Sequence, residues 1–136
     1  MKILSLSSNI AGNACAVAYS IKNFYNNNYQ TNFFDYLEIS LLSINQVLNE
    51  ETIYDKLNSN QTMVTNKDNK ESVYFNNFHK IISHHDLVNN YNNKEYIYFI
   101  EKYKRRHIRF LDTIKSENKI FFIRYGFEDY ENITTF

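Results

Sequence analysis

The chain has one cysteine, Cys15, at the point where a short apolar run gives way to a segment with helical spacing. A cysteine in the first turn of a helix is exposed to the positive end of the helix dipole, which favours thiolate over thiol. The backbone N–H groups of that turn can also stabilise a developing oxyanion. The position is typical of a nucleophile, but a cysteine flanked by alanines is more often a small buried side chain. Both interpretations stay open from the residues alone.

The pair His84-His85, followed by Asp86, is the second group that could do chemistry. A histidine can act as general base near neutral pH, and Asp86 or Asp35 is the expected carboxylate that orients its ring. Adjacent residues on a strand point to opposite faces, so we expect at most one of the two rings to face the cysteine. A polar loop cluster is the alternative. The histidines lack metal-site spacing, so we expect no metal and no cofactor.

Basic residues concentrate in one segment near the end of the chain. They are Lys102, Arg105, Arg106 and Arg109. On a helix these positions form a single stripe, which is suited to a phosphate, a sugar phosphate, a carboxylate or an acidic protein partner. Arg124 and Asn13 are further candidates for substrate binding. A solvated helix face and an internal ion-pair network remain the alternatives.

The elements that must position these side chains alternate between strands and helices. Expected strands cover residues 3–6, 29–35, 78–83 and 120–123, the last of them buried, with two short ones at 63–64 and 73–75. Expected helices cover residues 14–24, with Asn13 as N-cap, then 41–57, broken near Glu51, and 94–115. The alternation predicts a single α/β domain over residues 1–136 with a mostly parallel sheet. An α+β fold is the alternative.

In an open α/β sheet, the binding crevice lies outside the carboxyl ends of the strands. Cys15, Asp35, His85 and Arg124 each follow or lie near the end of an expected strand. We therefore expect these side chains to converge on one edge of the sheet.

Composition limits the class of protein. The chain of 136 residues is 43% hydrophobic, which is enough for one core, and its 15 basic and 15 acidic residues leave a net charge of zero. Neutrality counts against nucleic acid and anionic membranes as partners. One cysteine, no signal peptide and no long apolar run predict a cytoplasmic protein acting on a small molecule or a peptide. The Asn-rich composition is typical of an AT-rich genome.

Several segments, in their order along the chain, resemble a domain family of unknown function described as papain-like cysteine peptidases. They are GNACAVAYSIKNF, NFFDYLE, ISHHDL, KYKRRHIRFLDTI and KIFFIRYG. The resemblance covers residues 3 to about 125. It implies that Cys15 is the nucleophile, that His85 and Asp86 form a His-Asp pair, and that Asp35 belongs to a Phe-Asp box. It also implies that Lys102, Tyr103, Arg105, Arg106 and Arg109 form the family's basic helix and that Arg124 is its strand-end arginine.

The sequence departs from the family pattern at three places. Ser7 stands where the family has glycine, Tyr36 stands where it usually has tryptophan, and family members generally continue beyond the last strand. Asp129 or Asp35 would then replace a late triad residue. We expect a cysteine-dependent hydrolase with Cys15 as nucleophile and His85 as base, in a shortened and either active or degenerate form. A non-enzymatic binding module built on the basic helix is the alternative.

Overall fold

The computed structural model describes residues 1–10, 12–25, 28–66, 68, 70–127, 131, 133 and 136, so Asp129 lies outside the described residues. The strands are β1 (Lys2–Ser8), β2 (Leu37–Glu38), β3 (Gln61–Asn66), β4 (Glu71–Asn76), β5 (Ile81–Val88) and β6 (Ile120–Tyr125). The helices are α1 (Ala16–Tyr25), α2 (Leu41–Leu48), α3 (Tyr54–Leu57) and α4 (Asn93–Ser116). No helix in these ranges is long and apolar enough to cross a bilayer.

The strands described form one mixed sheet in the order β3-β4-β5-β2-β1-β6. β1 runs parallel to β2 and β6, whereas β2, β5, β4 and β3 pair antiparallel in turn. The predicted α/β class is confirmed. The sheet is mixed instead of mostly parallel because β3, β4 and β5 are joined by short turns, and only antiparallel neighbours can be joined that way.

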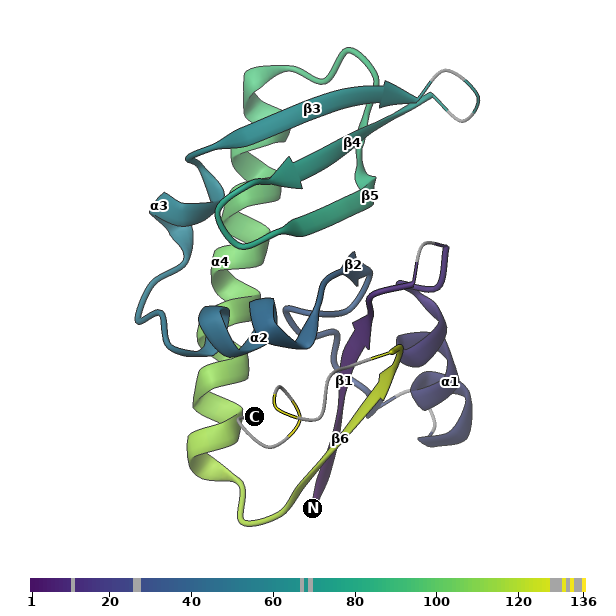
Figure 1. Ribbon diagram of the computed structural model, residues 1–136, viewed down its shortest axis with the longest axis vertical. Helices are drawn as coiled ribbons and strands as arrows, with labels where there is room; N and C mark the ends of the chain where they lie inside the picture. Colours follow the sequence, from purple (N-terminus) through teal and green to yellow (C-terminus); the bar gives the residue numbers. More distant parts are fainter. Residues whose placement is uncertain are drawn as a thin grey trace.

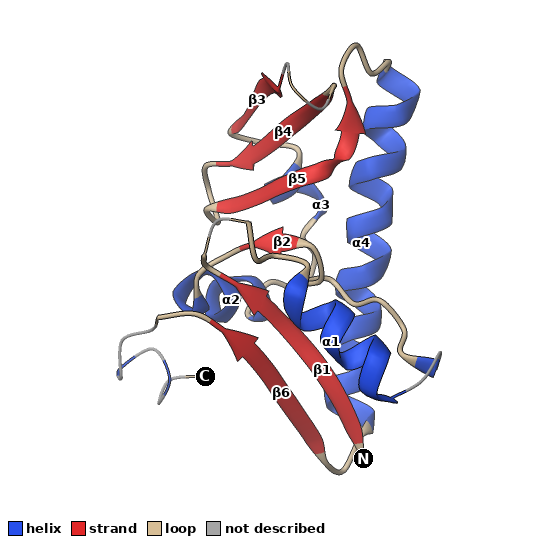
Figure 2. Cartoon of the chain, turned by 90° about the vertical axis from the view of Figure 1, so that its right-hand side faces the viewer, coloured by secondary structure: helices blue, strands red, loops and turns tan. Residues whose placement is uncertain are grey.

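Figure 1 shows two groups of strands, with β3, β4 and β5 above and β1 and β6 below. β2 links the groups: Glu38 pairs with Ser8 of β1 on one side and with Ile82 of β5 on the other. α4 runs beside both groups along the length of the molecule, as Figures 1 and 2 show. α1 lies beside the lower group.

α4 supplies a large part of the core. It starts with a capping box between Asn92 and Glu95, and it buries one stripe of side chains, as the sequence spacing predicts. The buried members are Phe99, Ile100, Tyr103, His107 and Phe110. Phe33 packs edge-on against Tyr103, with ring centroids 5.6 Å apart, and Phe34 against Phe110 at 5.0 Å. The loop before β2 is thereby fixed on α4.

Four expected elements differ from the structure. The strand expected at residues 78–83 is β5, which begins three residues later and continues through both histidines. Residues 29–35 form a loop, not a strand, because the Asp35 carboxylate accepts hydrogen bonds from within that segment, and the strand follows at β2. α1 begins two residues later than expected, so Asn13 is not its N-cap. β6 lies at an edge of the sheet and exposes Phe121 and Tyr125, so it is not the buried strand that its apolar run suggested.

Candidate active site

Ser7 determines how the chain leaves β1 toward the cysteine. Its φ of 55° lies in the left-handed region, which favours glycine, the residue that the family pattern has at this position. The buried Ser7 hydroxyl lies 2.9 Å from the Ala14 carbonyl oxygen and also contacts that of Leu37. These contacts offset the backbone strain and hold the residue before Cys15 against the start of β2.

Cys15 directly precedes α1, and its carbonyl accepts the N–H of Tyr19 at 3.0 Å, the first bond of the helix. The thiol is free and partly buried. Asn13 makes a turn instead of a cap: its N–H donates to the Ile10 carbonyl, and its own carbonyl accepts from Ala16. The structure therefore places the cysteine directly before the helix, and not in its first turn as the sequence predicted.

The electrostatic surroundings of the thiol differ from the expectation. Burial raises the pKa of Cys15, and the negative charges of Asp86 and Asp35 raise it further. All three effects oppose the thiolate that a helix start would otherwise favour. The sulfur is therefore a neutral thiol at pH 7, and it needs a base at the moment of attack.

The two histidines lie on a bulge of β5. Between the pairs Tyr74 with Ser83 and Ser72 with Leu87, one residue of β4 faces three residues of β5. A bulge bends its strand and redirects its side chains. The rings of His84 and His85 are 6.1 Å apart, so the alternation expected for a regular strand does not hold here.

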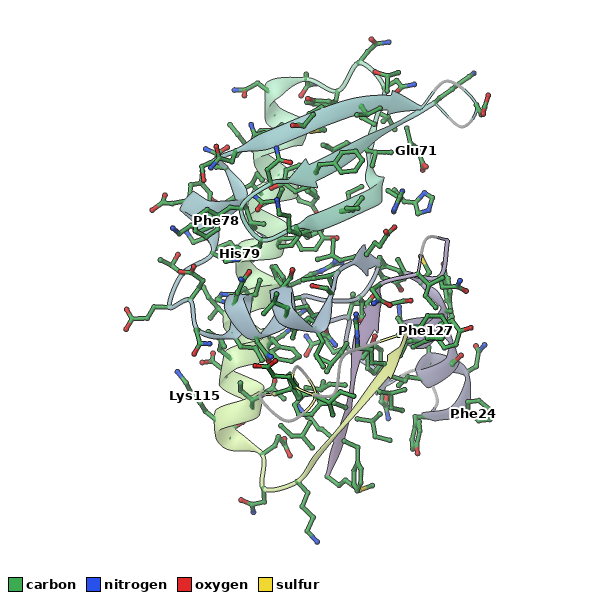
Figure 3. All side chains as sticks on the ribbon, in the orientation of Figure 1. Phe24, Glu71, Phe78, His79, Lys115 and Phe127 are labelled. Atoms are coloured by element: carbon green, nitrogen blue, oxygen red, sulfur yellow. The ribbon has the colours of Figure 1, made fainter. Side chains whose placement is uncertain are left out.

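Each histidine is held by a glutamate on a neighbouring strand. His84 Nε2 lies 2.8 Å from Glu38 Oε2 on β2, and His85 Nδ1 lies 2.7 Å from Glu71 Oε2 on β4. Figure 3 labels Glu71 near the end of the antiparallel strands. The His84 side chain is 33% exposed and that of His85 58% exposed, so the His84 pair is the more enclosed.

Sequence reasoning missed both glutamates. Glu38 is the acid at the end of the second strand, and the rule that selected Asp35 would have selected Glu38 if that strand had been placed at residues 37–38. Glu71 opens β4, and its partnership with His85 depends on strand pairing, which no local pattern reveals.

In the described part of the chain, the Asp86 carboxylate is hydrogen-bonded to groups other than the His85 ring. It accepts hydrogen bonds from the Ser83 hydroxyl, the Lys102 ammonium and, at 2.6 Å, the Tyr103 hydroxyl. Burial alone would raise the pKa of Asp86, but the Lys102 charge and these hydrogen bonds bring it below its usual value. Asp86 thus anchors β5 to α4 as a charged group.

Asp35 is fully buried in the loop that precedes β2. Its carboxylate accepts the Tyr29 hydroxyl at 3.0 Å and the Asn32 N–H at 2.9 Å. Burial raises the pKa of Asp35 despite these bonds and despite the charge of Lys22. Its influence on Cys15 is therefore electrostatic, and the histidine rings have other partners.

The residues of the predicted basic stripe interact with several different groups of the same chain. Lys102 binds Asp86, Arg106 lies over the Tyr103 ring at 5.2 Å, and Arg109 donates to the Thr31 carbonyl. Arg105 lies over the Tyr98 ring at 5.9 Å. Arg124 donates to the carbonyls of Leu6 at 2.6 Å and Ile39 at 2.5 Å, where it joins β6 to β1 and to the end of β2. Within the described residues, no cluster of ligating side chains is suited to a metal ion.

The described residues include a free thiol at a helix start and two imidazoles paired with carboxylates on the sheet, which are the residue types that cysteine hydrolases use. The family model described as putative papain-like cysteine peptidase matches residues 8–134, and the chain belongs to this family. The resemblance noted in the sequence is thereby confirmed. No curated protein and no solved structure matched the chain.

Proposed function

We propose that this chain is a cysteine-dependent acyl hydrolase in which Cys15 is the nucleophile and the His84-His85 pair supplies the base. The observation that carries the proposal is a continuous set of contacts. The Ser7 hydroxyl is hydrogen-bonded to the carbonyl oxygen of Ala14, the residue before Cys15, and it also contacts the carbonyl oxygen of Leu37. Leu37 pairs with Ser83, directly before the two histidines.

The raised thiol pKa defines the first step. An imidazole takes the Cys15 proton as the sulfur attacks the acyl carbon, and the S–C bond forms. Backbone N–H groups at the start of α1 would donate to the oxyanion. The imidazolium then protonates the leaving group, and water hydrolyses the thioester to regenerate the thiol.

The family resemblance implies that His85 is the base, and the carboxylate that would orient it is Glu71, which lies 2.7 Å from His85 Nδ1, instead of Asp86. The geometry also supports His84, whose pair with Glu38 lies at the end of β1 that leads to Cys15. Carboxylate pairing fixes the orientation of either ring. Variants of the two pairs discriminate between these assignments.

The test is acylation by 4-nitrophenyl acetate, followed as a burst of 4-nitrophenolate per chain. Cys15→Ala should abolish the burst. Substitution of the base by asparagine should slow acylation by about 100-fold or more. A loss shared by His85→Asn and Glu71→Gln assigns His85, whereas a loss shared by His84→Asn and Glu38→Gln assigns His84. Glu51→Gln, at an exposed position, is the matched control.

Two results would contradict the proposal. One is a burst that persists in Cys15→Ala. The other is a wild-type acylation rate in a double His84→Asn, His85→Asn variant that keeps its native circular dichroism spectrum.

A further inference from the structure

A cavity of about 270 Å³ lies at the amino end of β1, between α1 and α4. Cys15 follows the opposite end of this strand, whose seven residues span about 20 Å. The volume is just below the range of roughly 300–1,000 Å³ that holds drug-sized ligands. The cavity is therefore separate from the candidate active site and sized for a small ligand.

Apolar side chains form much of the wall. Leu4, Ile21 and Phe110 line the cavity and belong to the buried core, each less than 10% exposed. Tyr29 and Asn32 also line it, but their hydrogen-bonding atoms are already engaged with Ser5, with Asp35 and with each other. The body of a ligand would therefore meet mainly hydrocarbon and aromatic surface.

The charged groups that line the cavity are cationic. Lys2 and Arg109 are among the lining residues, and no aspartate or glutamate is among those that the structure describes there. The Lys2 ammonium lies 3.5 Å from Glu117 and is half exposed, so a second anion can share it. Among the residues that the structure describes, Arg109 gives one hydrogen bond, from Nη2 to the Thr31 carbonyl, and a guanidinium carries five N–H donors.

The surroundings of Arg109 favour an added negative charge. Burial lowers the pKa of Arg109, and the nearby cations Arg106 and Arg105 lower it further, more strongly than Asp35 opposes them. A group whose neighbours disfavour its positive charge is stabilised when an anion binds beside it. Arg109 is also held in place by its bond to Thr31, so little side-chain entropy is lost on binding.

We propose that this cavity is a binding site for a small apolar carboxylate, with the carboxylate on Arg109 and the apolar body between α1 and α4. The site is independent of the reaction proposed for Cys15.

The test titrates the full chain with naphthalene-2-carboxylate and with its neutral analogue, naphthalene-2-carboxamide. Binding is followed by the methyl NMR signals of Ile3, Leu4 and Ile21. We expect both compounds to shift these signals, with the carboxylate binding at least tenfold more tightly because only it can pair with the guanidinium.

Variants at cationic positions test whether Arg109 provides the preference for the carboxylate. Arg109→Met should reduce the preference for the carboxylate to less than twofold, and Arg109→Lys should restore part of it. Lys104→Met, a cation on the same helix outside the cavity lining, should leave it unchanged. Equal affinities for the two compounds in the wild-type chain, or shifts confined to residues outside the cavity, would overturn the proposal. Cys15→Ala should bind like wild type, so failure of the proposed hydrolase leaves this result unaffected.

Discussion

Asp35 and Asp86 both raise the pKa of the Cys15 thiol, yet they are held in opposite ways. The loop around Asp35 offers only neutral hydrogen-bond donors, and burial raises the pKa of its carboxyl. The region around Asp86 provides the Lys102 ammonium, which holds the pKa of that carboxyl below its usual value. The paired cation thus keeps the Asp86 carboxylate charged to a lower pH than usual, whereas the Asp35 carboxylate takes up a proton at a higher pH than usual.

The largest difference between the two regions should come from removing the cation. Lys102→Met leaves the Asp86 carboxylate buried without its counter-ion, and we expect the free energy of unfolding to fall by about 3–5 kcal/mol. Urea denaturation measures this loss. Lys115→Met is the matched control, because Lys115 is an exposed lysine of the same helix (Figure 3), and it should change stability by less than about 0.5 kcal/mol. A Lys102→Met loss no larger than the control would show that the ion pair does not distinguish Asp86 from Asp35.

The next effect is on the pH dependence of stability. At pH values between the usual aspartate pKa of about 4 and the raised pKa of Asp35, the folded state binds more protons than the unfolded state. Stability therefore falls as pH rises through this window, by about 1.4 kcal/mol for each unit of pKa difference. Asp86 acts in the opposite direction, because its stabilisation is lost as pH falls from the usual pKa toward its lowered one.

Asp35→Asn should flatten the decline in stability above pH 4, measured by urea denaturation at a series of pH values. Asp112→Asn, at an exposed position on α4, should leave the slope unchanged. An undiminished slope in Asp35→Asn would mean that Asp35 does not carry the raised pKa.

The smallest effect concerns the thiol itself. Asp35 contributes less than burial and less than Asp86 to the raised pKa of Cys15, so Asp35→Asn should lower the thiol pKa only slightly. The rate of iodoacetamide alkylation against pH gives the thiol pKa directly, because the chain has one cysteine. An equal shift in Asp112→Asn would show a general charge effect in place of a local one.

The long periodic elements could be predicted from the sequence, and the turns could not. α4 and β1 follow from apolar spacing. The turns before β4 and β5 use Lys70 and Lys80 with φ of 57° and 53°, where glycine or asparagine would be the usual signal. Because lysine gives no turn signal at these two positions, the sequence predicted the strands of the two hairpins as parts of a mostly parallel sheet.

The candidate site likewise has features that the sequence predicts and features that it does not. The position of Cys15 close to a helix start is a local property and was predicted. The partners Glu38 and Glu71 depend on a bulge and on pairing between distant strands, so residue spacing along the chain does not encode them. Asp86 was expected beside His85 because the two are neighbours in the sequence, but the structure joins it to α4.

α4 has a mechanical consequence for this site. Its 24 residues form a rod of about 36 Å. Tyr103 joins it to β5 through Asp86, and Phe110 joins it to the loop before β2. The sheet between these attachments narrows to β2, which has two residues. Because it is attached on both sides of this narrow point, the helix resists bending of the sheet at Leu37–Glu38. Such bending would change the distance between the Cys15 sulfur and the imidazoles of β5.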